Sequence, residues 1–383
     1  MKVVYVVPYD WGGMPHYTAE LANAVSKYAD VTVLCSKEIQ INYFNENIRI
    51  VKIFDKLDIS IGDFSTFLSF KNLIALISLR KIKIIRDINP DILHFTTPLI
   101  LPLPFFIRLY GVNKSISTVF TVHSMHQDSG ILRELIGKIN CLCGRMINYK
   151  KVVCHTERDR EELIRIRRFP NEKICVIPHG SYEFFSNNKN EKRRSNESAP
   201  NIYVLFFGYI KKYKGLEYLI RAAHLISKDF PNLKVIIAGE GDLSPYHKLI
   251  GENSQSLFEI HNRFVTDEET SLLFQKTSLV ILPYTQMTGQ SGVMNIALAF
   301  GKPVIATDVW GLNEVLENGK TGLIIPAKNS KALALAISTL LNDEKLRKEM
   351  ERNVLTKCQE LSWSNLAKRY IDLYQNLGKN TNK

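Results

Sequence analysis

The sequence predicts an α/β protein with two doubly wound, parallel-sheet (Rossmann-like) domains that face a central cleft. Strand-like apolar runs alternate with helix-like segments along the whole chain, as in parallel sheets covered by helices on both faces. The 383 residues exceed what one core of ordinary size holds. The alternation is interrupted once, at the polar and charged residues 186–200, where we expect a flexible surface connection.

The first domain is predicted over residues 1–182. Its strands are expected where continuous apolar runs occur, at 2–8, 31–36, 91–95, 115–123, 151–156 and 173–178. Amphipathic segments at 18–29 and 131–150 are predicted to be helices between them.

The second domain is predicted over residues 183–363. Apolar runs predict strands at 201–208, 234–239, 279–284, 303–307 and 321–326. Helices are expected between them at 216–230, 268–277, 294–300 and 332–343. A last helical segment, 364–378, is expected to pack back on the first domain.

The composition, 45% hydrophobic and 23% charged residues, is that of a soluble globular protein. The N-terminus lacks the layout of a signal peptide, and no run of about 18 apolar residues occurs, so we expect a cytoplasmic protein without a membrane span. The six cysteines form no CxxC pair, and most have apolar neighbours. This favours buried free thiols over a metal site.

The formal charge is +12, which raises the question of an anionic partner. No zinc-finger spacing and no aromatic RNA-binding signature occurs, so nucleic acid is not the expected partner. The charge is concentrated near residues 67–87, where basic side chains lie among leucines and isoleucines: Lys71, Arg80, Lys81, Lys83 and Arg86. Such a helix fits an anionic membrane surface, and equally a core-facing helix with a solvated basic edge.

Ligands of open parallel sheets bind at the carboxyl ends of the strands, so the strand-to-helix loops are the candidate sites. Gly12 and Gly13 follow the first strand. A glycine pair lets the backbone approach a phosphate or a sugar, although two glycines also form an ordinary tight turn.

Two loops of the second domain favour an anion. After Gly208, three lysines, among them Lys211 and Lys214, precede the next helix. Lysines there oppose the helix dipole unless an anion shares the site, and a solvated lysine cluster is the alternative. The stretch TGQSGVMNIALAFGKPVIATDVWG, residues 288–311, opens a helix with small residues, and its unpaired N–H groups suit an anion.

Several motifs together resemble one family. They are IPHG at 177–180, GYIKKYKGLEYLIRAA at 208–223, IAGEGD at 237–242, RFVTDEE at 263–269 and FGKPVIATDVWGLNEV at 300–315. In these stretches the chain resembles the retaining glycosyltransferases of family 4, which have the two-domain fold called GT-B. The resemblance runs from the glycine pair to the tail, and it implies that the anion is the diphosphate of a nucleotide-sugar.

The resemblance also implies roles for single residues. Lys214 matches the lysine that binds the donor diphosphate, and His123 matches the active-site histidine beside the donor sugar. His123 also fits a packed histidine at a strand end. The remaining donor-binding positions implied are Gly12, Gly13, Gly208, Lys211, Arg263, Phe264, Gln290, Ser291, Gly292 and Val293. Of these, Arg263 and Phe264 fall where the family holds the base.

The chain departs from the family at three positions. Tyr209 replaces the family arginine, and Lys211 is close enough to supply its charge. Thr288 and Ile296 stand where many members have glutamates, the second of which holds the ribose hydroxyls. Isoleucine accepts no hydrogen bond, so the ribose must be held otherwise or less tightly.

The resemblance implies a hexose transfer from UDP or GDP to a hydroxyl of a glycan or lipid-linked acceptor, in surface polysaccharide assembly. No Asp-x-Asp pair occurs, so we expect neither a metal nor another cofactor. Lys214, Lys211 and the amides of 291–293 would stabilise the leaving diphosphate. Retention follows if the acceptor attacks the face that the diphosphate leaves, with a phosphate oxygen taking the proton.

Two other functions remain open. Without the acidic pair, the chain could be a catalytically silent nucleotide-sugar-binding subunit, although an intact Lys214 and His123 argue against this. Binding of nucleic acid by the basic surface would show a strong salt dependence. The basic segment makes glycan assembly at the inner face of the plasma membrane, on a membrane lipid, the expected setting.

Overall fold

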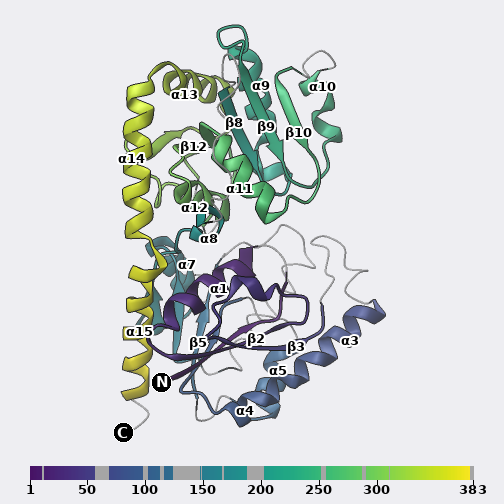
Figure 1. Cartoon of the computed structure of the whole chain (residues 1–383), viewed down its shortest axis with the longest axis vertical. Coiled ribbons are helices and arrows are strands. Elements are labelled where there is room, and N and C mark those ends of the chain that lie inside the picture. The colour runs from purple at the N-terminus through teal and green to yellow at the C-terminus, as the bar shows by residue number, and fades with distance from the viewer. Residues whose placement is uncertain are drawn as a thin grey trace. The chain divides into compact units, whose positions relative to one another are not determined.

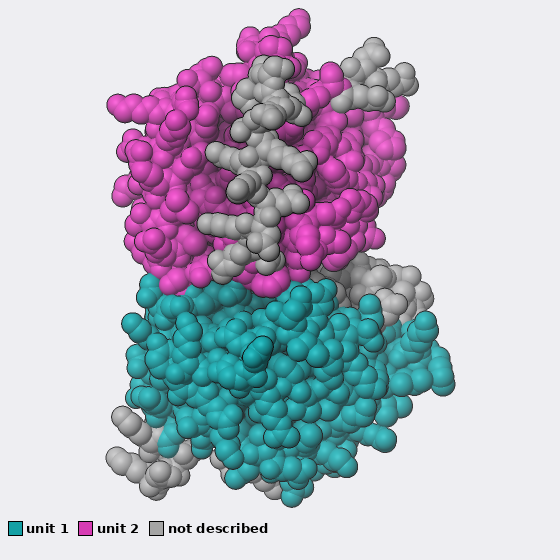
Figure 2. Space-filling model, in the orientation of Figure 1, with its two compact units in different colours: residues 1–180, 363–383 teal, residues 181–362 magenta. Residues whose placement is uncertain are grey.

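The computed structural model describes residues 1–10, 13–56, 69–97, 102–112, 116–123, 147, 149–165, 168–187, 202–251, 256–286, 290–309 and 311–379. The chain divides into two compact units, which Figure 2 colours separately. Unit 1 is Met1–Gly180 with Trp363–Lys383, and unit 2 is Ser181–Ser362. The sequence predicts these boundaries after residues 182 and 363. The roles that the family resemblance implies, an acceptor side for the first domain and nucleotide-sugar binding for the second, stay predictions.

Unit 1 contains a seven-stranded parallel sheet in the order β3-β2-β1-β4-β5-β6-β7 (Figure 1). The strands are β1 (Lys2–Val7), β2 (Asp30–Ser36), β3 (Arg49–Phe54), β4 (Ile92–Phe95), β5 (Ser117–Thr121), β6 (Lys151–Cys154) and β7 (Ile174–Val176). Its helices are α1 (Gly13–Val25), α3 (Phe70–Ser78), α4 (Ile85–Ile88), α5 (Leu103–Leu109), α7 (Glu157–Arg165) and α15 (Trp363–Lys379), with 3-10 turns η1 (Ile41–Tyr43), η2 (Leu79–Ile84) and η3 (Asn171–Lys173).

Both faces of this sheet are buried, because successive side chains of a strand point to opposite faces. In β1, Val3, Tyr5 and Val7 pack in the core that α1 and α15 cover. Val4 and Val6 pack in the opposite core, under α3, η2, α4, α5 and α7. The apolar runs of the sequence are therefore continuous rather than alternating.

Unit 2 contains a six-stranded parallel sheet in the order β10-β9-β8-β11-β12-β13 (Figure 1). The strands are β8 (Ile202–Phe207), β9 (Leu233–Ala238), β10 (Phe258–His261), β11 (Leu279–Leu282), β12 (Val304–Thr307) and β13 (Gly322–Ile325). Its helices are α8 (Glu183–Asn187), α9 (Leu216–Ile226), α10 (His247–Ile250), α11 (Asp267–Lys276), α12 (Gly292–Ala299), α13 (Ser330–Asn342) and α14 (Glu344–Glu360), with 3-10 turns η4 (Lys212–Lys214) and η5 (Ser244–Tyr246). The prediction of two doubly wound parallel-sheet domains is confirmed.

Helix α15 belongs to unit 1, where it packs on α1. Its tyrosines enter the core: Tyr370 Oη lies 2.7 Å from Tyr17 Oη, and Tyr374 Oη lies 3.1 Å from Tyr5 Oη. Tyr374 Oη also lies 2.6 Å from His94 Nδ1, so a chain of buried hydrogen bonds holds the last helix to the first strands.

Several predictions fall outside the described residues. The helix expected at 131–150 lies almost entirely there, as does all of the polar stretch after Asn187. Within the described ranges, four cysteines occur and all are free, with Cys35 and Cys154 buried and Cys175 and Cys358 half-buried. No described helix combines the length and the apolar character that crossing a membrane requires.

Candidate functional site

The loops after β8, β9 and β10 are joined by backbone hydrogen bonds at the carboxyl edge of the unit 2 sheet. Gly208 N donates to Ala238 O at 2.9 Å, and Gly239 N donates to His261 O at 3.0 Å. Gly239 has φ +143°, and a Cβ there would lie 2.3 Å from the Gly208 carbonyl oxygen. This close approach explains the first glycine of IAGEGD, which the sequence analysis did not single out as a site residue.

Lys214 is a buried cation at this edge. The side chain is 7% exposed, and Nζ donates to the Phe207 carbonyl at 3.3 Å and lies 5.6 Å from the centre of the Tyr284 ring. No carboxylate among the described residues forms an ion pair with it. Burial, and then the charge of Lys211, lowers the pKa of Lys214 to about 8. A bound anion would supply the missing opposite charge.

Two other predicted residues, Gly208 and Val293, lie near this ammonium. Gly208 has φ +93°, and a Cβ on it would lie 2.7 Å from Lys214 Nζ and 3.6 Å from Val293 Cγ2. Glycine at 208 therefore both permits the left-handed turn and leaves room for the lysine. The structure thus brings Gly208, Lys214 and Val293 together.

Helix α12 begins beside them. Ser291 is its N-cap, with Oγ accepting from Met294 N at 3.4 Å and lying 3.4 Å from Tyr284 Oη. Gln290 precedes it, half-buried. Tyr284, which sequence reasoning missed, therefore contacts both Lys214 and the helix cap. The residues LPY at the end of β11 are the only sequence signal for it.

Gly292, the first residue of α12, has no special backbone requirement. It is exposed, it has no positive φ, and a Cβ would meet only Tyr182 Cε2, at 3.6 Å. The alternative that glycine is needed here for the turn is therefore not supported.

We expect Gly292→Val to weaken nucleoside diphosphate binding at least about tenfold while changing stability by less than about 1 kcal/mol, as exposed positions usually do. Valine would occupy the space in which the ligand is expected, whereas Gly292→Ala, the matched control, adds one methyl group. Calorimetric titration with UDP and GDP beside thermal melts measures both effects. A valine variant that melts early but binds normally when folded would contradict this placement.

Ile296 is a core residue. Its side chain is 6% exposed and packs with Leu282 and Phe274 in the core of unit 2. It faces away from water, so this position offers nothing to a ribose. Thr288, the other position at which the family has a glutamate, lies outside the described residues.

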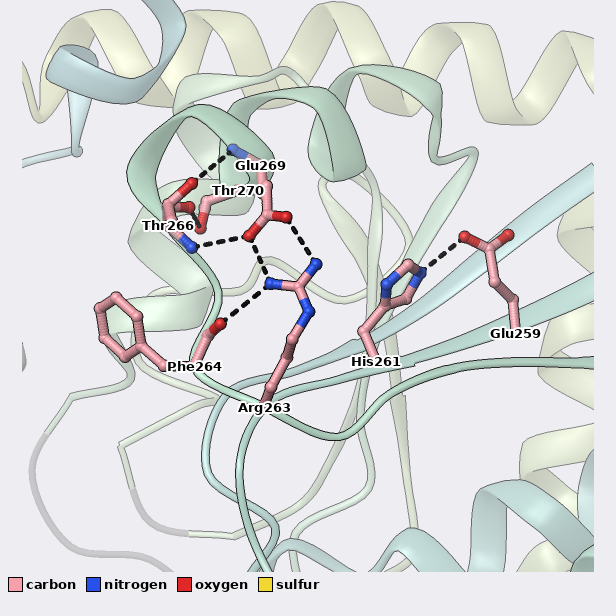
Figure 3. A network of polar contacts seen from close by, with 7 residues as sticks. All are labelled: Glu259, His261, Arg263, Phe264, Thr266, Glu269 and Thr270. Carbon is pink, nitrogen blue, oxygen red and sulfur yellow. Dashed lines mark hydrogen bonds and ion pairs between the residues drawn. The ribbon is translucent and has the colours of Figure 1, made fainter.

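Arg263 and Phe264 follow β10, and Figure 3 shows their contacts. The Arg263 guanidinium forms two bonds with Glu269, from Nη1 at 2.8 Å and from Nη2 at 2.6 Å, and Nη1 donates to the Phe264 carbonyl at 3.1 Å. These bonds hold the pKa of Glu269 at about 2. Glu269 also accepts from Thr266 N in the capping box of α11.

The Arg263 side chain is thus part of a helix cap, and its part in base binding stays a prediction. Phe264 is 67% exposed, so its ring remains accessible. Lys211 is half-buried at the N-cap of η4, and Tyr209, at the position of the family arginine, is 43% exposed.

In unit 1, Gly12 lies outside the described residues, and Gly13 is the exposed first residue of α1. His123 lies two residues after β5, partly exposed. Both of its ring nitrogens are in contact: Nε2 lies 2.7 Å from Thr96 O, and Nδ1 lies 3.2 Å from His155 Nε2.

Sequence reasoning missed three further histidines of unit 1: His94, His155 and His179, all buried. They lie at or just after the ends of β4, β6 and β7, and His123 occupies the equivalent place after β5. Burial lowers the pKa of His94 and of His179 to about 3. The available signal was one histidine at the end of each strand-like run, in DILHF, KVVCHT and IPHG.

Comparison with known proteins identifies both halves of the chain. Residues 11–181 match the family model "Glycosyltransferase Family 4", and residues 187–356 match "Glycosyl transferases group 1". The alpha-D-kanosaminyltransferase of Streptomyces kanamyceticus is 27% identical over 239 residues, which are 59% of this chain and 60% of that protein. The capsular polysaccharide biosynthesis glycosyltransferase CapM of Staphylococcus aureus is 27% identical over 240 residues, 57% of this chain and 60% of that protein.

Solved structures share the fold. HepE of Anabaena, in complex with UDP-glucose, superposes with a TM-score of 0.70 at 17% identity, covering 98% of this chain and 100% of that chain. A glycosyltransferase of Rickettsia africae gives a TM-score of 0.72 at 17% identity, covering 99% of each chain. Against the curated relatives named above, the chain spans about 60% of their length.

Proposed function

Because the chain belongs to the glycosyltransferases of family 4 and group 1, with the GT-B fold, we propose that it transfers a hexose-type sugar from a nucleotide-sugar to an acceptor hydroxyl, with retention. The buried, unneutralised ammonium of Lys214 carries the proposal. Burying a charge without an opposite charge nearby costs free energy, and the attraction to a bound anion would offset that cost.

The donor diphosphate is proposed to bind at the loop after β8. Lys214 Nζ, Gly208 and Val293 meet there, and the first turn of α12 supplies backbone N–H groups. Lys211 adds a second positive charge, since its field already acts on Lys214. The base is proposed to lie near the loop after β10, where the exposed Phe264 ring could stack on it.

In the transfer itself, negative charge grows on the leaving nucleoside diphosphate. Lys214, Lys211 and the amides of 291–293 are proposed to stabilise that charge. The acceptor hydroxyl is proposed to attack from the face that the diphosphate leaves and to pass its proton to a phosphate oxygen. This route needs neither a protein nucleophile nor a metal.

UDP is the proposed nucleotide, with GDP as the alternative. The HepE complex with UDP-glucose supports UDP, and the name of CapM supports an acceptor of the polysaccharide class. Unit 1 is the proposed acceptor side. Gly12 and Gly13 keep the donor-binding role, and His123 the place beside the donor sugar, that the family resemblance implies.

A catalytically silent donor-binding subunit is the second candidate, and Ile296 favours it. Its side chain packs in the core, where many relatives are expected to have the carboxylate that holds the ribose. Incubating the protein with UDP- and GDP-sugars and a polyprenyl-linked acceptor, with and without EDTA, separates the two. Product with the anomeric configuration of the donor, formed in EDTA, supports the transferase. Donor binding without transfer or hydrolysis supports the subunit.

The surface around α3 is proposed to dock on an anionic membrane. The segment contributes to the core through Ala75, Leu79 and Ile82, as the core-facing interpretation expects. The other face of α3 exposes apolar side chains. Helix α5, which contacts η2, exposes apolar side chains as well. These exposed residues are Phe70, Leu73, Ile74, Ile77, Phe105 and Leu109. The basic residues that follow on η2 and α4 complement anionic headgroups.

Reversing three of these charges, with Arg80, Lys81 and Lys83 each changed to Glu, should release the protein from anionic vesicles. Each basic residue near such a surface contributes about 1 kcal/mol, so we expect a loss of at least about a hundredfold in partitioning. The control variant changes Lys331, Lys345 and Lys368 to Glu, which alters the net charge equally at exposed positions elsewhere. Equal co-sedimentation of the two variants, or no binding by the wild type, would refute the docking surface.

A further inference from the structure

The imidazoles of His123 and His155 meet through nitrogen atoms. His123 Nδ1 lies 3.2 Å from His155 Nε2. The outer nitrogens face backbone carbonyls: His123 Nε2 lies 2.7 Å from Thr96 O, and His155 Nδ1 lies 2.9 Å from Ile177 O. A carbonyl oxygen only accepts, so each outer nitrogen must carry a hydrogen atom.

These contacts fix the number of hydrogen atoms. A neutral imidazole has one N–H group, and here both rings use theirs on a carbonyl. Two neutral rings would therefore face each other with lone pairs, which repel at this distance. One additional proton turns the contact into an N–H···N hydrogen bond. Three hydrogens on two rings satisfy all three contacts.

Other titratable groups surround the pair. Tyr17 of α1 lies edge-on to His123, with ring centres 4.4 Å apart, and 5.5 Å from His155. The His179 ring lies 5.2 Å from His155, and His94 interacts electrostatically with both rings. Tyr370 of α15 contacts the Tyr17 hydroxyl. Burial opposes a charge on the pair, whereas sharing between two rings and the two carbonyl dipoles favour it.

We propose that His155 is a positioning residue for His123, and that the two imidazoles bind a single proton between His123 Nδ1 and His155 Nε2. Both nitrogens of His123 are then occupied, so its ring is held in one orientation and does not act as the base for an acceptor hydroxyl. The positioning role of His155 in sugar transfer rests on the proposed function, whereas the shared proton is independent of it.

The shared proton is tested without substrate, by long-range ¹H–¹⁵N correlation spectra of the full-length protein labelled at histidine. Spectra of His123→Gln and His155→Gln assign the two rings. We expect the pair to take up one proton in a single step as the pH falls, at a higher pH than His94 and His179. Two independent titrations would overturn the proposal, and so would a pair that stays neutral until His94 and His179 titrate, or a His155 protonated at Nε2 and not at Nδ1.

Positioning is tested by two variants of similar size. His155→Leu removes the partner, and we expect turnover to fall about tenfold. His155→Gln can donate to His123 Nδ1 without titrating, so it should restore most of this turnover but lack the pH step of the wild type. A merely structural role predicts that both variants lose activity in proportion to their melting temperature. If no transfer occurs in any variant, the proposed function fails while the spectra still decide the shared proton.

Discussion

Replacing Lys214 with alanine should abolish sugar transfer and weaken nucleoside diphosphate binding by about 30- to 1000-fold. A buried charge-assisted contact to a phosphate is worth about 2–4 kcal/mol where no water competes. The same substitution should leave the ligand-free protein as stable as the wild type or more stable, because it removes a buried cation without a carboxylate partner. Calorimetric titration with UDP and GDP, beside thermal melts, measures both effects.

Lys212→Ala is the matched control for this experiment. Lys212 lies in the same 3-10 turn and carries the same charge, but its side chain is exposed. It should bind the nucleotide within about threefold of the wild type, as exposed charges contribute little. Two outcomes would show that Lys214 does not bind the donor: a Lys214→Ala variant that keeps more than about a tenth of wild-type turnover, or a Lys212→Ala control that loses as much as Lys214→Ala.

Lys214 also predicts a pH dependence. Its pKa is about 8, so the ammonium is lost as the pH rises through that value. Nucleoside diphosphate binding should therefore weaken above about pH 8 in the wild type and much less in Lys214→Ala.

Mild acid should destabilise unit 1 strongly. His94 and His179 have a pKa of about 3 in the folded protein, through burial, against about 6.5 when unfolded. Between these values the unfolded chain binds a proton at each histidine and the folded chain does not. The stability present above about pH 6.5 is thus lost as the pH falls towards 3, at about 1.4 kcal/mol per pH unit for each histidine.

Urea unfolding between about pH 5 and about pH 7.5 measures this slope while the carboxylates remain ionised. Over this range the two histidines should lower the free energy of unfolding by about 4 kcal/mol, with a slope that approaches about 2.7 kcal/mol per pH unit only at the acid end. This is a large share of the stability of an ordinary domain. His179→Gln should reduce the number of protons taken up on unfolding by one, and the slope with it, whatever the substitution does to the stability at neutral pH. An equal slope in the wild type and the variant would show that His179 is protonated in the folded state.

The sequence by itself determined the architecture. Continuous apolar runs indicate strands buried on both faces. Strand β1 confirms this, because Val3, Tyr5 and Val7 lie in one core and Val4 and Val6 lie in the other. Local chemistry was also readable, because a glycine before a lysine at a strand end has few explanations besides a turn and an anion. The loop pattern drew attention to the lysines after Gly208, and the family resemblance selected Lys214 among them. The capping box of Thr266 and Glu269 could have been read from spacing alone.

Only the tertiary structure decided which side chains meet. The contact of Arg263 with Glu269 is one example: both terminal nitrogens of the guanidinium bond the Glu269 carboxylate, and the part of Arg263 in base binding stays a prediction. The sequence around Ile296 does not show which way this side chain points. In the structure it lies on the face of α12 that packs in the core.

The four histidines of unit 1 are the clearest case. They are separated by 24 to 32 residues in sequence, and each alone is an ordinary strand-end histidine. Because β4, β5, β6 and β7 are adjacent and parallel, their carboxyl ends meet at one edge of the sheet. The four histidines therefore lie in one cluster, in which all but the partly exposed His123 are buried. The proposed proton between His123 and His155 is a property of their contact, which no single stretch of sequence contains.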